Sequence, residues 1–306
     1  MSDPRVSPAF TDNRPRIQRV LAPLVFNRPL PDDHFWLRLD VGAMARKVAP
    51  GHFVQVDPGM GFTVPRPLSI WNADPAQGWI DLLVRQVGAG TRVMAEWRAG
   101  RKVALHGPAG RVFAPPLTGY SALLVAGGVG LAPMDFMARR WRAAGVPCLL
   151  LYGCERAAPL PLVTGAGVFP GLREPDGFLP EALAHLETLG VPSRLTSLGD
   201  AHPGRHRGYV TDLMRHWLAD LPQERRALVR IYTCGPTPMM AAVAAVAAEF
   251  HLGGEASLEE HMACGFGGCA GCVSPIRDAL GGESAYRRVC VDGPVFSLDR
   301  VDWEHM

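Results

Sequence analysis

Short runs in which hydrophobic and polar residues alternate fill the chain from about Arg16 to Pro116. Alternation with a period of two is typical of strands that have one buried and one exposed face. Turn residues separate the runs about every 8–12 residues, and no long helical pattern interrupts them. This part is therefore predicted to be an antiparallel β-barrel or sandwich. The runs are RIQRVLAPLVF (16–26), HFWLRLDV (34–41), GHFVQVDP (51–58), WIDLLVRQV (79–87) and KVALHG (102–107).

The pattern changes after Pro115, Pro116 and Gly119. Apolar runs now alternate with helical patterns, as expected for the βαβ units of a doubly wound parallel sheet. The segments expected as strands are ALLVA (122–126), CLLLYG (148–153), RLTSL (194–198) and the apolar part of LVRIYTCGP (228–236), and those expected as helices follow GGVGLAP (127–133), cover YVTDLMRHWL (209–218) and span about 237–250.

Two turns in this second half follow predicted strands at their carboxyl ends. Glycine lets backbone amides approach a pyrophosphate at a helix N-terminus, and open α/β sheets bind ligands at this edge. Glycine there also has a purely structural interpretation, because it lets a helix pack close to a strand. Two such turns in one sheet favour a nucleotide site. The turns are Gly127-Gly128-Val129-Gly130 and Thr233-Cys234-Gly235-Pro236.

Length and charge narrow the class of protein. A chain of 306 residues is long enough for about two domains with real cores. The net charge is +2, and lysine and arginine are spread along the chain, so we expect no nucleic-acid partner. The N-terminus has no apolar segment of the signal-peptide kind, and no apolar stretch is long enough to span a membrane. We therefore expect a soluble, cytoplasmic protein.

Four of the seven cysteines cluster near the C-terminus. Cys264, Cys269 and Cys272 follow the pattern C-x4-C-x2-C, and Cys290 comes after a polar segment, RDALGGESAYRR, that is expected to form a hairpin. This is the plant-type spacing of a [2Fe–2S] cluster, and the interspersed glycines suit a loop that turns backbone N–H groups toward sulfur. A structural zinc site is the alternative, but zinc sites usually present paired C-x2–4-C knuckles. The spacing predicts a [2Fe–2S] cluster held by these four cysteines.

The motifs resemble the ferredoxin–NADP reductase superfamily of flavoproteins over nearly the whole chain. Arg66-Pro67-Leu68-Ser69, expected at the end of a strand, is similar to its R-P-x-S flavin motif. The resemblance implies that Arg66 contacts the FAD pyrophosphate, that Ser69 lies near the isoalloxazine ring, and that Cys234 is the catalytic residue beside the nicotinamide. The implied FAD-binding residues are Arg66, Pro67, Leu68, Ser69, Leu83, Val84, Arg85, Gly90 and Thr91, and the implied NAD-binding residues are Gly127, Gly128, Gly130, Gly235 and Pro236.

The last fifth of the sequence resembles one particular family within this superfamily. SLEEHMACGFGGCAGCV (257–273) and RVCVDGPVF (288–296) closely resemble the electron-transfer subunit of class 1B dihydroorotate dehydrogenase. That family implies FAD, a [2Fe–2S] cluster and NAD as cofactors, a role in pyrimidine biosynthesis, and a separate FMN-containing catalytic subunit as partner in a heterotetramer. Met262 and Phe266, beside the cysteines, either offer apolar docking area to that partner or only cover the cluster.

The resemblance also implies a domain order. We expect an N-terminal tail at 1–14, an antiparallel FAD-binding β-barrel at 15–118, a doubly wound parallel NAD-binding domain at 119–252 and a small [2Fe–2S] domain at 253–306. Two alternatives stay open. One is a reductase subunit of the same superfamily that serves a hydrogenase, a sulfide-linked complex or a ferredoxin-dependent complex. The other is a non-catalytic metal-binding regulator on a flavoprotein scaffold, which flavin and iron–sulfur absorption would exclude.

Overall fold

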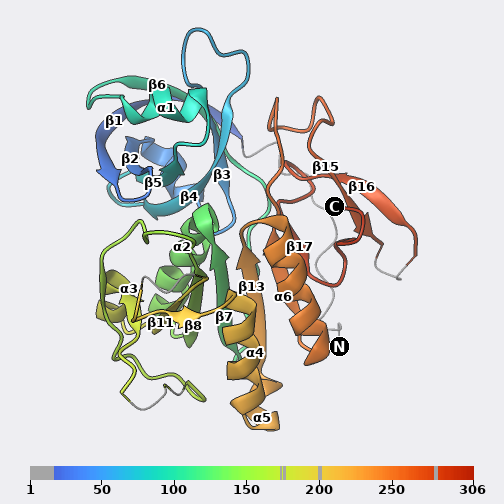
Figure 1. Cartoon of the computed structure of the whole chain (residues 1–306). Coiled ribbons are helices and arrows are strands. Elements are labelled where there is room, and N and C mark those ends of the chain that lie inside the picture. The colour runs from blue at the N-terminus through green and yellow to red at the C-terminus, as the bar shows by residue number, and fades with distance from the viewer. Residues whose placement is uncertain (1–16, 173, 175–176, 199–201, 279–281) are drawn as a thin grey trace. The chain divides into compact units, whose positions relative to one another are not determined.

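The chain divides into two compact units (Figure 1). Unit 1 holds the residues up to 113 together with 257–306, and unit 2 holds 114–256. The residues predicted to bind the cluster thus share a unit with the predicted flavin-binding strands, while the finer division at 118/119 and 252/253 stays a prediction. The predicted tail at 1–14 lies outside the described residues. The residues that the computed structural model describes are 17–172, 174, 177–198, 202–278 and 282–306.

Six antiparallel strands of unit 1 close into a barrel in the order β1-β2-β5-β4-β3-β6 (Figure 1). Alternate side chains fill its interior, and Leu37, Leu39, Val54 and Val56 are completely buried. Because β1 pairs with both β2 and β6, the sheet closes on itself, and the outcome is a barrel and not a sandwich. The strands are β1 (Gln18–Leu30), β2 (His34–Asp40), β3 (Phe53–Val56), β4 (Arg66–Asp74), β5 (Trp79–Arg85) and β6 (Lys102–Ala109), with the 3-10 helix η2 (Gly42–Lys47) and the helix α1 (Ala89–Ala95) between them.

The strand β4 is the barrel strand that the alternation did not predict. Its first half, Arg66 to Ser69, is half-buried at every position instead of alternating, and Pro67 has no N–H to donate. Both features hide a strand from a period-two pattern. The flavin motif therefore lies at the start of a strand, and the expected position at the end of one was wrong.

A two-stranded antiparallel hairpin follows the cysteine loop, as RDALGGESAYRR predicted. Its strands are β15 (Val273–Arg277) and β16 (Ser284–Arg288), and the strand β17 (Val295–Ser297) comes after them. The Asp302 carboxylate holds the hairpin, because it accepts hydrogen bonds from Arg277 Nη2 at 3.0 Å and Ser284 Oγ at 2.5 Å. With the Ser284 hydroxyl as the largest cause, these contacts lower the pKa of Asp302 to about 2, so the anchor is ionised at neutral pH.

Unit 2 contains a mostly parallel sheet with the strand order β12-β11-β8-β7-β13-β14, which confirms the predicted doubly wound class. No helix among the residues that the structure describes is long and apolar enough to cross a membrane. The strands are β7 (Ser121–Gly127), β8 (Cys148–Gly153), β9 (Leu162–Thr164), β10 (Glu181–Leu183), β11 (Ser193–Ser197), β12 (His206–Arg207), β13 (Val229–Cys234) and β14 (Gly254–Ser257). The helices are η3 (Gly128–Gly130), α2 (Leu131–Ala143), α3 (Ala184–Thr188), α4 (Val210–Asp220), α5 (Gln223–Arg226) and α6 (Thr237–Glu249).

The strand order reverses between β7 and β13. The chain runs from β7 outward through β8 to β11, and then returns to place β13 on the other side of β7. Right-handed crossovers in opposite directions put α2 and α4 on opposite faces of the sheet. Consistent with this, α2 packs against α3, whereas α4 packs against α6. The carboxyl ends of β7 and β13 therefore form the switch point at which such sheets bind ligands.

Candidate functional site

The Arg66 guanidinium lies against the start of α1, where phosphate binding was predicted. A Cβ added at Gly90 would lie 2.7 Å from Arg66 Nε and 2.9 Å from Nη2, so a side chain at position 90 would force the guanidinium to move. Nη1 donates to the Val64 carbonyl at 2.5 Å, which fixes the direction of the side chain. Among the described residues, no carboxylate pairs with Arg66. A positioned arginine without an acidic partner, next to a bare backbone, fits a pyrophosphate.

Thr91 shapes the turn ahead of α1. Its Oγ1 accepts hydrogen bonds from the backbone N–H groups of Val87 and Gly88, each at 3.1 Å, and donates to the Gly88 carbonyl. The side chain is buried and its hydroxyl is fully engaged. Thr91 can therefore hold the cofactor loop in place, and the backbone of the turn is what remains for a ligand.

The other residues of the predicted FAD site lie on two strands. Leu83 and Val84 of β5 are buried. Arg85, at the end of β5, forms an ion pair with Asp32 at 3.5 Å, so its charge already has a partner. Pro67, Leu68 and Ser69 are half-buried on β4. The structure thus brings Arg66 and Gly90 together, and the roles of the remaining residues stay predictions.

The two glycine turns of unit 2 meet at the switch point. A Cβ on Gly130 would overlap the Cys234 carbonyl, and one on Gly235 would lie 3.0 Å from the backbone N of Gly127. Gly235, with φ +158°, and Gly128, with φ +53°, adopt conformations that other residues rarely take. No heavy atom lies within 4 Å of a Cβ added at Gly128. The turns after β7 and β13 therefore pack backbone against backbone, with the Met239 side chain against Gly127 and Gly235, at the edge of the sheet where a nucleotide site is predicted.

Cys234 ends β13, at this edge of the sheet, and Pro236 caps α6. The Cys234 side chain is 1% exposed. Its position at the switch point agrees with the predicted place beside the nicotinamide, while its burial equally suits a small filler at the end of a strand. The catalytic role of Cys234 stays a prediction.

The four predicted cluster ligands converge within unit 1. Cys272 and Cys290 are buried and hydrogen-bond to each other through their side chains, although they are 18 positions apart in the sequence. Cys264 is half-buried and contacts the side chain of Cys269, which is exposed. The Cys272 carbonyl also accepts a hydrogen bond from the Val289 backbone N–H at 2.7 Å, which brings the residue before Cys290 back to the loop. The cysteines thus form two pairs, Cys264 with Cys269 and Cys272 with Cys290, and Cys264 is near enough to Cys290 for its charge to act there.

Backbone N–H groups point at the sulfur atoms of these cysteines. Burial acts most strongly on Cys264 and would raise its pKa, but hydrogen bonds from the N–H groups of Phe266, Cys269 and Gly268 outweigh it and lower the pKa to about 7. The hydrogen bond with Cys290 is the largest cause that lowers the pKa of Cys272, to about 6, and raises the pKa of Cys290. Thiolates that accept several N–H donors are the environment that a [2Fe–2S] cluster needs, so the residues fit that group.

Two apolar side chains beside the cysteines differ in exposure. Met262 is buried, so it covers the loop from within. Phe266 is 49% exposed, and its ring lies 3.0 Å from where a Cβ on Gly268 would be. The docking interpretation therefore concerns Phe266 alone.

Gln55 of β3 is a residue that the sequence analysis missed. Its side chain is buried against Gly265 of the cysteine loop, and among the described residues neither atom of its carboxamide has a hydrogen-bond partner. The sequence signal was weak: one glutamine between two buried valines in the run FVQV. Only the fold shows that it faces the loop.

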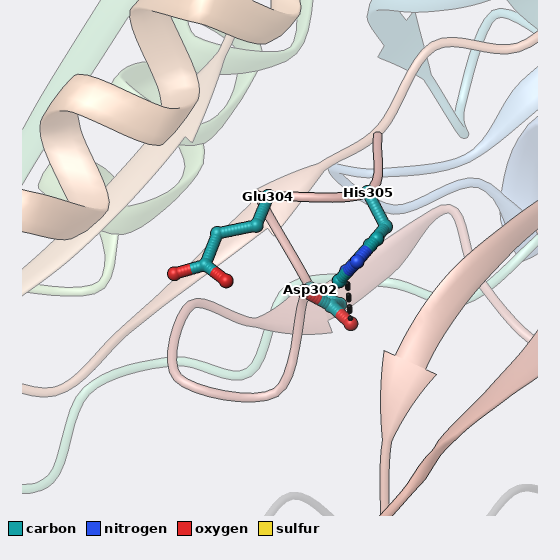
Figure 2. Close-up of side chains that lie close together, drawn as sticks. All are labelled: Asp302, Glu304 and His305. Carbon is teal, nitrogen blue, oxygen red and sulfur yellow. Dashed lines mark hydrogen bonds and ion pairs between the residues drawn. The ribbon is translucent and has the colours of Figure 1, made fainter.

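A separate group near the C-terminus brings Asp302, Glu304 and His305 together, with ligand-type atoms within 4.8 Å of one another. Figure 2 shows the His305 side chain turned toward the Asp302 carboxylate. The distance from His305 Nδ1 to Asp302 Oδ2 is 3.1 Å. Asp302 is already engaged by Arg277 and Ser284. The group therefore acts as an anchor for the hairpin.

The C-terminal segment matches a family model described as the iron–sulfur cluster binding domain of dihydroorotate dehydrogenase B, over residues 259–302. The chain is also similar to known proteins over most of its length. It is 31% identical over 275 residues to the dihydroorotate dehydrogenase B (NAD(+)) electron transfer subunit of Shouchella clausii. This match covers 88% of this chain and 92% of that protein. It is 29% identical over 272 residues to the subunit of the same name from Desulforamulus reducens, with 88% and 93% covered.

Solved structures support the fold. An NADH-dependent reduced ferredoxin–NADP oxidoreductase structure superposes with a TM-score of 0.73 at 24% identity, covering 93% of this chain and 91% of that one. The ferredoxin reductase of carbazole 1,9a-dioxygenase superposes with a TM-score of 0.58 at 21% identity, covering 80% of this chain and 67% of that one. At such identities the likeness concerns the fold alone.

The matched C-terminal region contains all four converging cysteines, and the full-length similarity includes the barrel and the sheet. These findings confirm the predicted resemblance. The chain belongs to the family of electron transfer subunits of dihydroorotate dehydrogenase B (NAD(+)).

Proposed function

We propose that this chain passes electrons between a dihydroorotate dehydrogenase catalytic subunit that contains FMN and NAD, by way of a [2Fe–2S] cluster and FAD, in pyrimidine biosynthesis. The observation that carries the proposal is the two cysteine pairs, Cys264 with Cys269 and Cys272 with Cys290, in the same compact unit as the Arg66 motif. One chain thereby holds residues suited to a one-electron carrier beside residues suited to a flavin. The chain is an NAD-linked flavin and iron–sulfur oxidoreductase subunit.

Each part of the chain has a task that follows from its geometry. Flavin is the cofactor that exchanges a hydride with nicotinamide and single electrons with an iron–sulfur cluster. The Arg66 guanidinium and the turn at Gly90 bind the FAD pyrophosphate. The backbone of Gly127, Gly130 and Gly235 binds NAD(H), with Cys234 beside the nicotinamide. Cys264, Cys269, Cys272 and Cys290 bind the cluster.

The partner docks where the cluster is closest to solvent. Cys269 is exposed, and the exposed ring of Phe266 lies in the same loop. A one-electron carrier that serves another protein has to lie near the surface, and an aromatic residue is a common anchor at interfaces. We place two copies of this chain with two catalytic subunits in a heterotetramer, in the cytoplasm, where thiols stay reduced.

The decisive experiment separates the chain from its partner. Purified protein, loaded with FAD and cluster, is expected to reduce ferricyanide with NADH. It is expected to form no NADH from dihydroorotate and NAD until the FMN-containing catalytic subunit is added. Native mass spectrometry of the mixture would then give the stoichiometry.

Two results would contradict the proposal. Formation of NADH from dihydroorotate by the isolated chain would show that no separate catalytic subunit is needed. Failure to couple with that subunit, with efficient coupling to a hydrogenase or ferredoxin instead, would assign the chain to another redox complex of the same superfamily.

A further inference from the structure

Gln55 lies on the outer face of the barrel, between the flavin motif and the cysteine loop. Its neighbours in β3, Val54 and Val56, point into the barrel core and are completely buried. The side chain of Gln55 therefore points the other way. It pairs directly with Pro67 of β4, so these two side chains share the outer face, which Ser69 two residues later also shares.

The Gln55 carboxamide is buried without a partner. The residue is 1% exposed, and neither Oε1 nor Nε2 has a hydrogen-bond partner within the described part of the chain. A buried amide loses its hydrogen bonds to water and gains nothing in return, which is costly for folding. Native structures rarely keep such a group unless something else satisfies it. The orphaned amide therefore points to a ligand.

The cysteine loop is the surface that covers this amide. A Cβ added at Gly265 would overlap Cγ, Cδ and Nε2 of Gln55, so the loop backbone rests directly on the carboxamide. Gly265 directly follows the ligand Cys264, and its φ of +71° turns the chain around that sulfur. Three backbone N–H groups already point at Cys264. The Gln55 carboxamide lies against the next residue, Gly265, and across the described ranges of the chain its Nε2 has a free N–H donor.

We propose that Nε2 of Gln55 donates a hydrogen bond to a sulfur atom of the bound cluster, either the Cys264 thiolate or an inorganic sulfide, and thereby sets the reduction potential of the cluster. The inference rests on the proposed function, because it requires the cluster. Sulfur accepts hydrogen bonds, and donors to sulfur stabilise the more negative, reduced state. Through this hydrogen bond, a residue of the flavin-binding barrel tunes the reduction potential of the cluster.

The test replaces the carboxamide by an apolar group of similar length. Gln55→Met in the fully loaded protein is expected to shift the cluster midpoint potential to a more negative value, measured by redox titration with electron paramagnetic resonance. The flavin midpoint potential, followed by absorption in the same titration, is expected to stay at its wild-type value. Gln77→Met is the matched control, because Gln77 is an exposed glutamine in a turn of the same barrel.

Stability separates tuning from packing. Because Gln55→Met removes an unsatisfied buried amide, the apoprotein is expected to melt at or above the wild-type temperature. An unchanged cluster potential, or a shift confined to the flavin, would overturn the inference. If Gln55→Met and Gln55→Leu both lose the cluster, the stability of their apoproteins decides between the two roles. Apoproteins as stable as the wild type would support the hydrogen bond. Less stable apoproteins would show that Gln55 has a packing role and would overturn the inference. Absence of any cluster in the wild-type protein would instead reject the proposed function, and the inference with it.

Discussion

The orientation of the Arg66 side chain is set by a hydrogen bond to the nearby Val64 backbone carbonyl. The Val64 carbonyl and the bare turn at Gly90 hold its guanidinium in place. Replacing Arg66 with Ala removes a charge-assisted contact worth about 1.5–3 kcal/mol, which corresponds to FAD binding about 10–100-fold more weakly.

The measurement for Arg66→Ala is the dissociation constant of FAD from flavin fluorescence, with the cluster followed by its visible absorption. The cluster is expected to stay, because its ligands lie elsewhere in unit 1. Arg92→Ala, on an exposed position of α1, is the control and should bind FAD like the wild type. Full flavin retention by Arg66→Ala at low protein concentration would reject Arg66 as an anchor.

Cys234 tests whether a buried thiol at the switch point takes part in hydride transfer. Cys148, at the start of β8 in the same sheet, is a matched buried cysteine, and burial raises its pKa to about 12. Alanine at either position is expected to cost about 1 kcal/mol of stability, because it removes one buried sulfur. Only Cys234→Ala is expected to slow flavin reduction by NADH, by about 10-fold, because it changes packing at the nicotinamide. Equal rates for both variants in stopped-flow absorption would make Cys234 a filler.

At the scale of elements, a buried ion-pair group joins α2 to α3. Asp135 of α2 is completely buried, and Arg139 Nε and His185 Nε2 each lie 3.0 Å from its Oδ1. Burial is the largest influence and would raise the pKa of Asp135, but the His185 and Arg139 contacts outweigh it and lower the pKa to about 2. A carboxyl with a lowered folded pKa stabilises the fold at every pH above its unfolded value, and this stability is lost as the pH falls.

Asp135→Asn is therefore expected to cost about 2 kcal/mol at pH 7, the equivalent of a pKa shift of nearly two units. The difference from wild type should be constant above about pH 5 and should shrink to about half near pH 3. Urea unfolding of the apoprotein, followed by circular dichroism across this range, measures it. A difference that grows as the pH falls would contradict the assigned direction of the shift.

At the scale of the whole molecule, Phe266 is the residue of the cysteine loop that we propose as the contact with the catalytic subunit. Phe266→Asp is expected to weaken binding of the catalytic subunit by about 10–100-fold, because it removes an aromatic anchor and places a charge in the interface. Surface plasmon resonance with the purified subunit measures the affinity. Leu21→Asp on β1 is the control, since Leu21 is 63% exposed and lies on the barrel. Unchanged affinity with an intact cluster would leave Phe266 as a cover only.

Features with a local cause could be predicted from the sequence alone. Strand alternation, the change to βαβ rhythm, the glycine turns and the C-x4-C-x2-C spacing each depend on residues close together in the chain, so the fold class and the family were confirmed. The hairpin at β15 and β16 was readable for the same reason. The roles of individual site residues and the limits of the three domains stay predictions.

Features that need distant segments were decided by the tertiary structure. The strand β4 is hidden by Pro67 and becomes a strand only because β3 and β5 pair with it. Closure into a barrel depends on β1 reaching β6. His185 is 50 positions from Asp135, and Gln55 is 210 positions from Gly265, so neither contact leaves a periodic trace in the sequence. Local propensity and spacing thus determined which elements and which cysteine motif the chain has, whereas long-range packing decided which side chains meet, because such contacts form only once the chain has folded.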